Sequence, residues 1–182
     1  MRRAVPIGRR HGSLNQDRRG LAAIEFALTL PVAFGLYLAT VEVTNLARAK
    51  TKFASVADSM AALVAEQNPI GPGTMTADFC TGEGYALAPF SAASLKIQVD
   101  SVTNVGGTVT DAWTKSCGSV SNATSAVTLA SSLVPSAGNS VIVVQTQYTY
   151  SAPISYLLPA TATFTGTGYA WPRLGTPIAY PP

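Results

Sequence analysis

The sequence holds few of the side chains that catalysis or metal binding requires. Its 182 residues include one histidine, His11, and two cysteines. Because His11 lies near the N-terminus, the rest of the chain has no imidazole for a Ser-His-Asp or Cys-His arrangement. Two thiols without a nearby histidine make a poor zinc site, and the glycines form no phosphate-binding motif. The sequence therefore predicts a non-enzymatic protein that binds no cofactor and no metal.

Charge is also scarce, and most of the positive charge is confined to one end. Charged residues make up 12% of the chain, against about 25% in an ordinary soluble domain. The first twenty residues contain six arginines and one aspartate, a net charge of +5; because the whole chain carries +3, the remainder carries −2. No basic surface is left there to bind a nucleic acid, so we expect no DNA or RNA partner. The six are Arg2, Arg3, Arg9, Arg10, Arg18 and Arg19.

One long apolar run follows the basic segment. Residues 21–41 contain a single charge, that of Glu25, and a helix of this length spans about 30 Å, the thickness of the hydrocarbon core of a bilayer. A helical pattern of apolar residues continues beyond the run until Asn68 and Pro69 interrupt it. We expect a basic leader over residues 1–20, a helix over 21–67 with 21–47 in the membrane, and a β-rich domain over 68–182.

The arginines before the apolar run also predict its orientation. Few cations follow the run, and positively charged flanks favour the cytoplasmic side of a membrane. The N-terminus is therefore expected in the cytoplasm and residues 68–182 outside the cytoplasmic membrane. A cleavable secretory signal is the competing interpretation. It is disfavoured because the apolar run is longer than a signal core and continues into an amphipathic helix.

In the C-terminal part the hydrophobic period changes from that of a helix to that of a strand. Leu95, Ile97 and Val99 alternate with polar residues, the pattern of a half-buried strand. We predict an α+β fold: a long, partly transmembrane N-terminal helix followed by a small antiparallel β-rich domain. The expected strands lie at residues 95–100, 108–114, 141–150 and 161–171. The acidic residues Asp78, Glu83, Asp100 and Asp111 are expected to be scattered and solvated.

The two cysteines, Cys80 and Cys117, both lie in the segment expected outside the cytoplasm, where disulfides persist. We therefore predict a disulfide between them. Closing a loop of this length stabilises a small domain by about 4 kcal/mol in the chain-entropy model.

Two stretches resemble a family of pilus proteins. Residues 18–35 read RRGLAAIEFALTLPVAFG, which places an acidic residue five positions after a glycine, inside an apolar helix. The junction resembles the processing site of type IV prepilins, and the stretch is similar to the TadE-like minor pilins or pseudopilins of tight-adherence (Tad, type IVb-like) pilus systems. Residues 148–173, YTYSAPISYLLPATATFTGTGYAWPR, are similar to that family's endings.

The resemblance implies cleavage between Gly20 and Leu21 by a prepilin peptidase, and a role for Glu25 and Phe26 in assembly. The chain would then be a structural or priming subunit in pilus assembly, adhesion and secretion. Its partners would be other pilin or pseudopilin subunits, the prepilin peptidase, the inner-membrane pilus assembly platform and the lipid bilayer. The implied location is the bacterial inner membrane, single-pass, with a cytoplasmic N-terminus and a periplasmic C-terminal domain, and incorporation into a pilus.

Three alternatives stay open at this point. Glu25 is either an assembly residue, pairing with the new N-terminus of a neighbouring subunit, or an interfacial carboxylate paired with Arg18 or Arg19. The whole chain is either a pilin-like subunit or an uncleaved bitopic protein whose outer domain binds an envelope partner or a surface polymer. Small residues at a spacing of four permit close helix packing in a membrane, or occur there by chance. They are Ala23, Ala27, Gly35 and Ala39, with Pro31 on the same line.

Overall fold

The computed structural model describes residues 18–71, 79–155, 159–173 and 177–180. The expected leader therefore lies largely outside the described residues. The chain divides into two compact units, Met1–Val41 and Glu42–Pro182, which are described separately.

The first unit consists of the apolar part of helix α1 (Arg18–Ala54). Every residue from Gly20 to Phe34 is exposed, including large apolar side chains such as Leu28. A helix that is apolar on all sides and covered by nothing suits a lipid environment. The hydroxyl of Thr29 donates to the carbonyl of Glu25 at 3.0 Å, which satisfies this polar group within the helix. Among the described residues, this is the one helix long and apolar enough to cross a membrane.

The second unit begins with the last turns of α1 and with α2 (Val56–Ala65). Only Ser55 separates the two helices, and its hydroxyl donates to the carbonyl of Lys52 at 3.0 Å. The predicted long N-terminal helix is thus confirmed, with one irregular residue. Its buried stripe recurs at helical spacing and consists of Ala49, Phe53, Val56, Ala57, Met60, Ala61, Val64 and Ala65.

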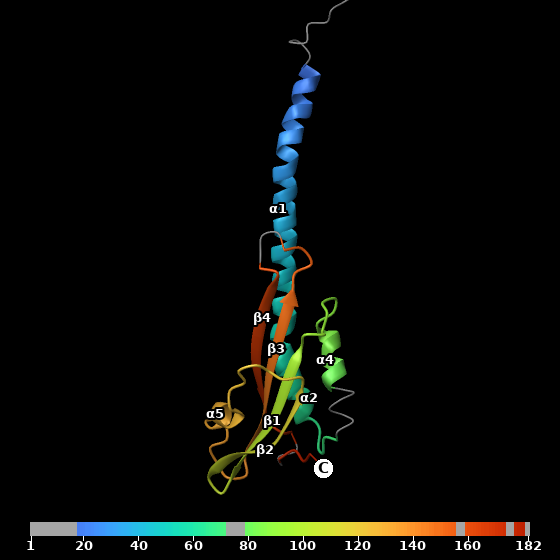
Figure 1. Cartoon of the computed structure of the whole chain (residues 1–182). Coiled ribbons are helices and arrows are strands. Elements are labelled where there is room, and N and C mark those ends of the chain that lie inside the picture. Colours follow the sequence, from blue (N-terminus) through green and yellow to red (C-terminus); the bar gives the residue numbers. More distant parts are fainter. Residues whose placement is uncertain (1–17, 72–78, 156–158, 174–176, 181–182) are drawn as a thin grey trace, which may run out of the picture. The chain divides into compact units, whose positions relative to one another are not determined.

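Four antiparallel strands form one sheet in the order β2-β1-β3-β4 (Figure 1). They are β1 (Lys96–Val105), β2 (Thr108–Cys117), β3 (Ser140–Ser151) and β4 (Thr161–Ala170), close to the ranges expected from the sequence. Gly106 and Gly107 join β1 to β2 with φ angles of 59° and 93°, the left-handed region that a tight hairpin requires. The predicted α+β class is therefore confirmed, and the structure adds the strand order.

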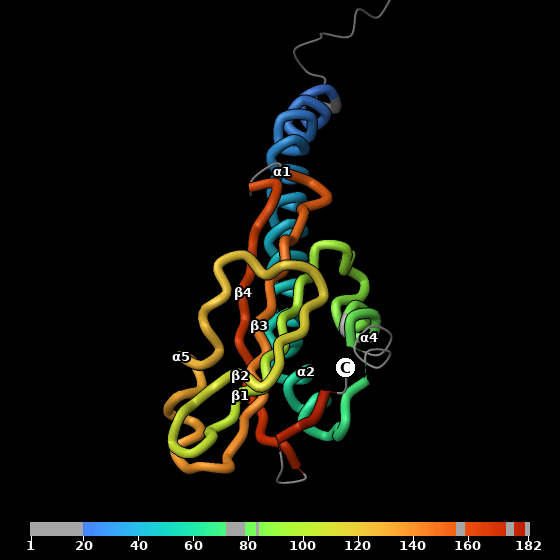
Figure 2. Tube along the Cα trace, turned by 60° about the horizontal axis from the view of Figure 1, so that its bottom comes forward, coloured from blue at the N-terminus to red at the C-terminus, as the bar shows by residue number. Residues whose placement is uncertain are grey.

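Both faces of the central strands are covered (Figure 2). On one face, Met60 and Val64 of α2 pack against Ile97, Ile142 and Val144 of the sheet. On the other face lies α5 (Ala126–Ala130), a short helix that the sequence analysis did not predict. A further unpredicted helix, α4 (Thr81–Ala86), lies beside α2. Strands β1 and β3 lie in the middle of the sheet, where α2 covers one face and α5 the other. Their residues are therefore buried on both faces rather than on one.

Two glycines of β4 lie against close neighbours, and at Gly168 that neighbour is the backbone of α2. A Cβ atom on Gly168 would lie 2.7 Å from the backbone nitrogen of Asp58, and closer still to the carbonyl of Ala57. A Cβ atom on Gly166 would lie 2.9 Å from the hydroxyl of Thr146. The absence of a side chain at Gly168 allows α2 to lie directly on β4, whereas Gly166 leaves room for the hydroxyl of Thr146 on β3.

Candidate functional site

The expected processing junction lies at the start of α1. Gly20 and Leu21 belong to the helix and are exposed. A Cβ atom on Gly20 would meet nothing within 4 Å, so no packing among the described residues requires a glycine at this position. A glycine inside a helix costs about 1 kcal/mol relative to alanine. Gly20 therefore has no packing role among the described residues, and its role in processing stays a prediction.

Glu25 lies one helical turn after Leu21, beside the exposed ring of Phe26. Its carboxylate projects from an otherwise apolar stretch, where an unpaired charge is costly in lipid. Among the side chains that the structure describes, none forms an ion pair with Glu25. The side chains of Arg18 and Arg19 lie outside the described set, so the interfacial pairing stays an alternative.

The small residues expected at a helix contact are all on α1. They recur at a spacing of four or eight over residues 23–39, with Pro31 on the same line, and a Cβ atom on Gly35 would meet nothing within 4 Å. Like Gly20, Gly35 therefore has no packing role inside the described chain. Helix packing through Ala23, Ala27, Pro31, Gly35 and Ala39 stays a prediction about contacts with other chains.

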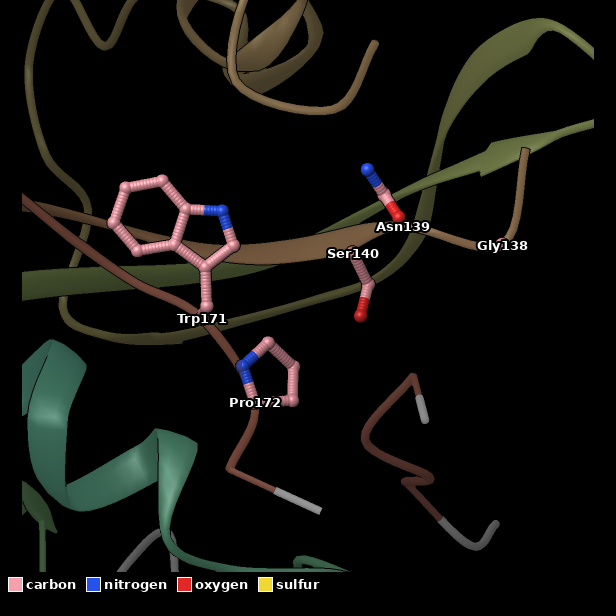
Figure 3. A pocket seen from close by; sticks show the side chains of 5 residues that line it. All are labelled: Gly138, Asn139, Ser140, Trp171 and Pro172. Carbon is pink, nitrogen blue, oxygen red and sulfur yellow. The ribbon is translucent and has the colours of Figure 1, made fainter. Parts of the chain in front are cut away.

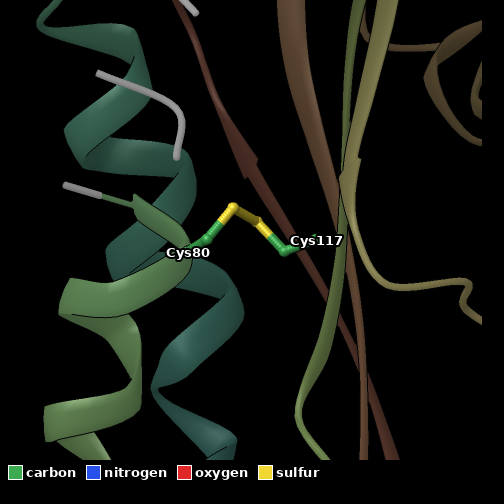
Figure 4. Close-up of a disulfide and its surroundings, with 2 residues drawn as sticks. All are labelled: Cys80 and Cys117. Carbon is green, nitrogen blue, oxygen red and sulfur yellow. A yellow bond between two sulfur atoms is a disulfide. The ribbon is translucent and has the colours of Figure 1, made fainter. Parts of the chain in front are cut away.

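A disulfide joins Cys80 to Cys117, as the sequence predicts (Figure 4). It links the residue before α4 to the last residue of β2, across a sequence separation of 37 and with the Cα atoms 5.6 Å apart. The bond therefore fixes α4 against the edge of the sheet.

Peptide mapping without reductant should recover Cys80 and Cys117 as one linked pair from freshly isolated envelopes. The bond requires an oxidising compartment, and the arginine asymmetry predicts that the domain lies in one. Blocking free thiols with an alkylating reagent during lysis provides the control. Recovery of both cysteines as alkylated thiols would contradict the bond in the cell and the expected topology.

The C-terminal segment is held beside the disulfide by contacts that the sequence analysis missed. The indole nitrogen of Trp113 donates to the carbonyl of Ile178 at 2.7 Å, and Ile178 is buried in the core. The amide of Ile70 donates to the carbonyl of Ala179 at 2.9 Å, and the rings of Trp113 and Tyr180 lie 5.5 Å apart. The end of the chain thus completes the core beside β2. Alternating patterns cannot reveal this, because the segment has no regular secondary structure.

The face of the sheet opposite α2 carries a polar network around Asp100, one of the four carboxylates expected to be solvated; Asp78 and the side chain of Glu83 lie outside the described residues, and Asp111 is exposed. Asp100 is 1% exposed, so the expectation that it is solvated is wrong. Its two carboxylate oxygens accept hydrogen bonds from the side-chain nitrogen Nε2 of Gln98 at 3.2 and 3.1 Å. Nearby, the side-chain amide of Gln145 accepts a hydrogen bond from the backbone nitrogen of Thr124 and donates one to its carbonyl, both at 2.8 Å. These two bonds anchor the loop that covers this face. Asp100 is buried because β1 is a central strand under that cover.

Asp111 lies across the β1–β2 pair from Val102, on the same face as Asp100. Although Asp111 is exposed overall, partial burial of its carboxyl raises the pKa, and the neighbouring charge of Asp100 raises it further. The folded chain therefore binds the Asp111 proton more tightly than the unfolded chain does. The resulting stabilisation is complete below the unfolded pKa and is lost as the pH rises through the folded pKa.

Asp111→Asn should accordingly raise the midpoint of thermal unfolding at pH 7 and leave it nearly unchanged below about pH 3. The reason is that asparagine resembles the protonated carboxyl and cannot ionise. Unfolding curves between pH 3 and pH 8 measure the effect. A difference between variant and wild type that is constant across this range would contradict a titration origin.

Glu42, the first residue of the second unit, is also buried, at 2% exposure. Burial raises the pKa of Tyr150, and the charge of Glu42 adds to the increase. This carboxylate was not singled out from the sequence, because it follows an apolar run without any motif. Among the described residues, no three metal-ligating side chains gather at one place.

The N-terminal helix matches a known family. Residues 20–61 match the family model described as TadE, TadE-like protein. The match covers α1 from Gly20 onward and the first part of α2, and it confirms the family resemblance for this segment. No curated protein and no solved structure matches the chain.

Proposed function

Taking the TadE-like match of residues 20–61 as the premise, we propose that this chain is a minor pilin or pseudopilin of a tight-adherence type IV pilus. In this proposal it is a non-enzymatic structural or priming subunit. A prepilin peptidase removes residues 1–20, and the subunit then meets other pilin or pseudopilin subunits at the assembly platform of the bacterial inner membrane. Its β-rich domain lies in the periplasm before incorporation into a pilus.

The observation that carries the proposal is the exposed junction at the start of α1. Gly20 and Glu25 stand five positions apart on an exposed helix, and neither contributes to packing inside the described chain. Cleavage after Gly20 creates an ammonium group on Leu21. Pairing of this ammonium with Glu25 of a neighbouring subunit neutralises two groups that are each costly in lipid. The same pair would set the axial position of one subunit against the next.

The disulfide and the apolar helix support the proposed location. A bond between Cys80 and Cys117 suits an oxidising compartment such as the periplasm. The excess of arginines before the helix favours a cytoplasmic N-terminus. Both features agree with a single-pass protein whose domain lies outside the inner membrane.

Replacing Gly20 by phenylalanine should leave the basic leader attached. A peptidase that cuts beside a small residue cannot place a bulky ring at the same point. Intact-mass measurement of the membrane-extracted protein, from a strain that holds the prepilin peptidase, would show the added mass of residues 1–20. Gly35→Ala is the matched control, because it also replaces a helical glycine that has no packing neighbour.

N-terminal sequencing of the wild-type protein separates the proposal from its rival. A chain that starts at Leu21 supports the pilin class. An intact leader favours the uncleaved bitopic anchor. Unchanged cleavage of the Gly20→Phe variant would show that the processing site lies elsewhere.

A further inference from the structure

A small hollow lies where β4 ends and β3 begins (Figure 3). Its volume is about 210 Å³, and its walls come from Gly138, Asn139, Ser140, Trp171 and Pro172. In Figure 3 the indole of Trp171 and the amide of Asn139 extend to the same side of the chain, with Ser140 and Pro172 below them. The hollow therefore combines an aromatic surface with polar side chains.

The exposure of Trp171 has no explanation within the fold. Its side chain is 56% exposed, and the structure records no hydrogen bond or ring contact for it among the described residues. The other tryptophan, Trp113, donates to Ile178 and packs on Tyr180. Tyr169, which lies on β4 two residues before Trp171, is also 37% exposed. The exposed ring of Trp171, just after the end of β4, offers an apolar face suited to stacking.

The polar wall of the hollow is held in place by backbone hydrogen bonds. The carbonyl of Asn139 accepts from the amide of Asn104 at 2.9 Å, and its own amide donates to Ser136 at 3.1 Å. Its side-chain amide makes no hydrogen bond within the described part of the chain. The backbone of Asn139 is therefore held in place, and its side-chain amide offers N–H donors and an oxygen acceptor to a ligand that carries hydroxyl groups.

The charges around the hollow favour a neutral ligand. None of its five lining residues is charged. Arg173, the next residue along the chain, lies 3.1 Å from the carboxylate of Glu66, which offsets its charge. Cofactor and drug sites usually measure about 300 to 1,000 Å³, so the hollow is large enough for only one small ring.

We propose that this hollow binds one pyranose unit of a neutral polysaccharide. The apolar face of the sugar ring stacks on the indole of Trp171, and vicinal hydroxyl groups exchange hydrogen bonds with the side-chain amide of Asn139. This combination of an aromatic platform and a neutral amide matches the two surfaces of a pyranose, one of C–H groups and one of hydroxyls. The proposal does not depend on cleavage at Gly20 or on pilus assembly.

The position of the hollow in its unit favours a polysaccharide over a lipid surface. The amide of Arg173 donates to the carbonyl of Ala65 at 3.1 Å, so the hollow lies near the end of α2. Glu42, where the chain enters the unit, lies about 35 Å earlier along the helices at 1.5 Å per residue. Trp171 is thus remote from the point at which the membrane segment joins the domain.

Two measurements on the full chain, in a detergent without a sugar headgroup, test the proposal. The first is co-sedimentation with amorphous cellulose and with chitin. Wild type should be retained, whereas Trp171→Ala should lose about tenfold in affinity and Asn139→Ala about fivefold. Tyr85→Ala is the matched control, because Tyr85 is an exposed aromatic, at 76%, that lies on α4 away from the hollow. This variant should bind as wild type does.

The second measurement uses the Trp113→Phe protein, in which Trp171 is the only tryptophan. Cellotriose and chitotriose should change its fluorescence in a saturable way. Failure of both polymers to retain wild type, or equal retention of Trp171→Ala, would overturn the proposal. Equal loss of binding in Tyr85→Ala would do the same. Quenching of Trp171 by brominated lipid in sugar-free nanodiscs would also overturn it, in favour of a membrane contact.

Discussion

Gly168→Val is expected to destabilise the second unit by at least about 4 kcal/mol. Already a single Cβ atom at this position would lie 2.7 Å from the backbone nitrogen of Asp58 and closer to the carbonyl of Ala57. Backbone atoms cannot move aside by a change of rotamer, so α2 has to lift from β4. The buried stripe of α2 would then lose contact with the sheet.

Thermal unfolding of the full chain in detergent measures this effect. Near-ultraviolet circular dichroism reports on the unit, because both tryptophans belong to it. The midpoint should fall by more than about 12 °C. Thr167→Val is the matched control, because Thr167 precedes Gly168 on the same strand but is exposed. A midpoint for Gly168→Val close to that of the control would show that α2 does not pack on β4 as described.

Glu25→Gln should abolish association with other pilus subunits while insertion and cleavage continue. Removing the charge lowers the cost of placing the helix in lipid, so membrane insertion should not be impaired. In the proposed assembly, the variant would be unable to pair with the ammonium that cleavage creates on Leu21 of a neighbouring subunit. If Glu25 is instead an interfacial carboxylate near Arg18 and Arg19, the change should have little effect, because exposed ion pairs contribute only about 0 to 1 kcal/mol.

Crosslinking and co-purification with other pilus subunits distinguish the two roles of Glu25. Glu66→Gln is the matched control, since Glu66 forms an exposed ion pair with Arg173 at 3.1 Å. It should leave association unchanged, and Glu25→Asp should restore part of it because the charge is kept. Association at wild-type levels by cleaved Glu25→Gln protein would refute the assembly role without affecting the membrane anchor.

Much of the fold could be predicted from local patterns. Residues 21–41 are apolar on all sides, and helical spacing of apolar residues then runs to Val64, so length and period together define the long helix. Alternation and β-branched residues located all four strands, and the two cysteines indicated their own bond. The resemblance to TadE-like proteins around Gly20 and Glu25 came from one short motif, the glycine followed five positions later by an acidic residue. The TadE-like match of residues 20–61 includes both positions.

Other features were decided only by tertiary structure. Asp100 alternates with apolar residues in the sequence, as a solvated residue on a half-buried strand does. The order β2-β1-β3-β4 nevertheless places it on a central strand, beneath a loop held by Gln145. The sequence alone gives no reason for a glycine at position 168. In the structure, its missing side chain lets the backbone of α2 lie against β4. The hollow beside Trp171 joins residues 138–140, where β3 begins, to residues 171–172, which follow the end of β4. Local periodicity determines which face of an element is apolar, whereas strand order and chain packing determine what covers that face.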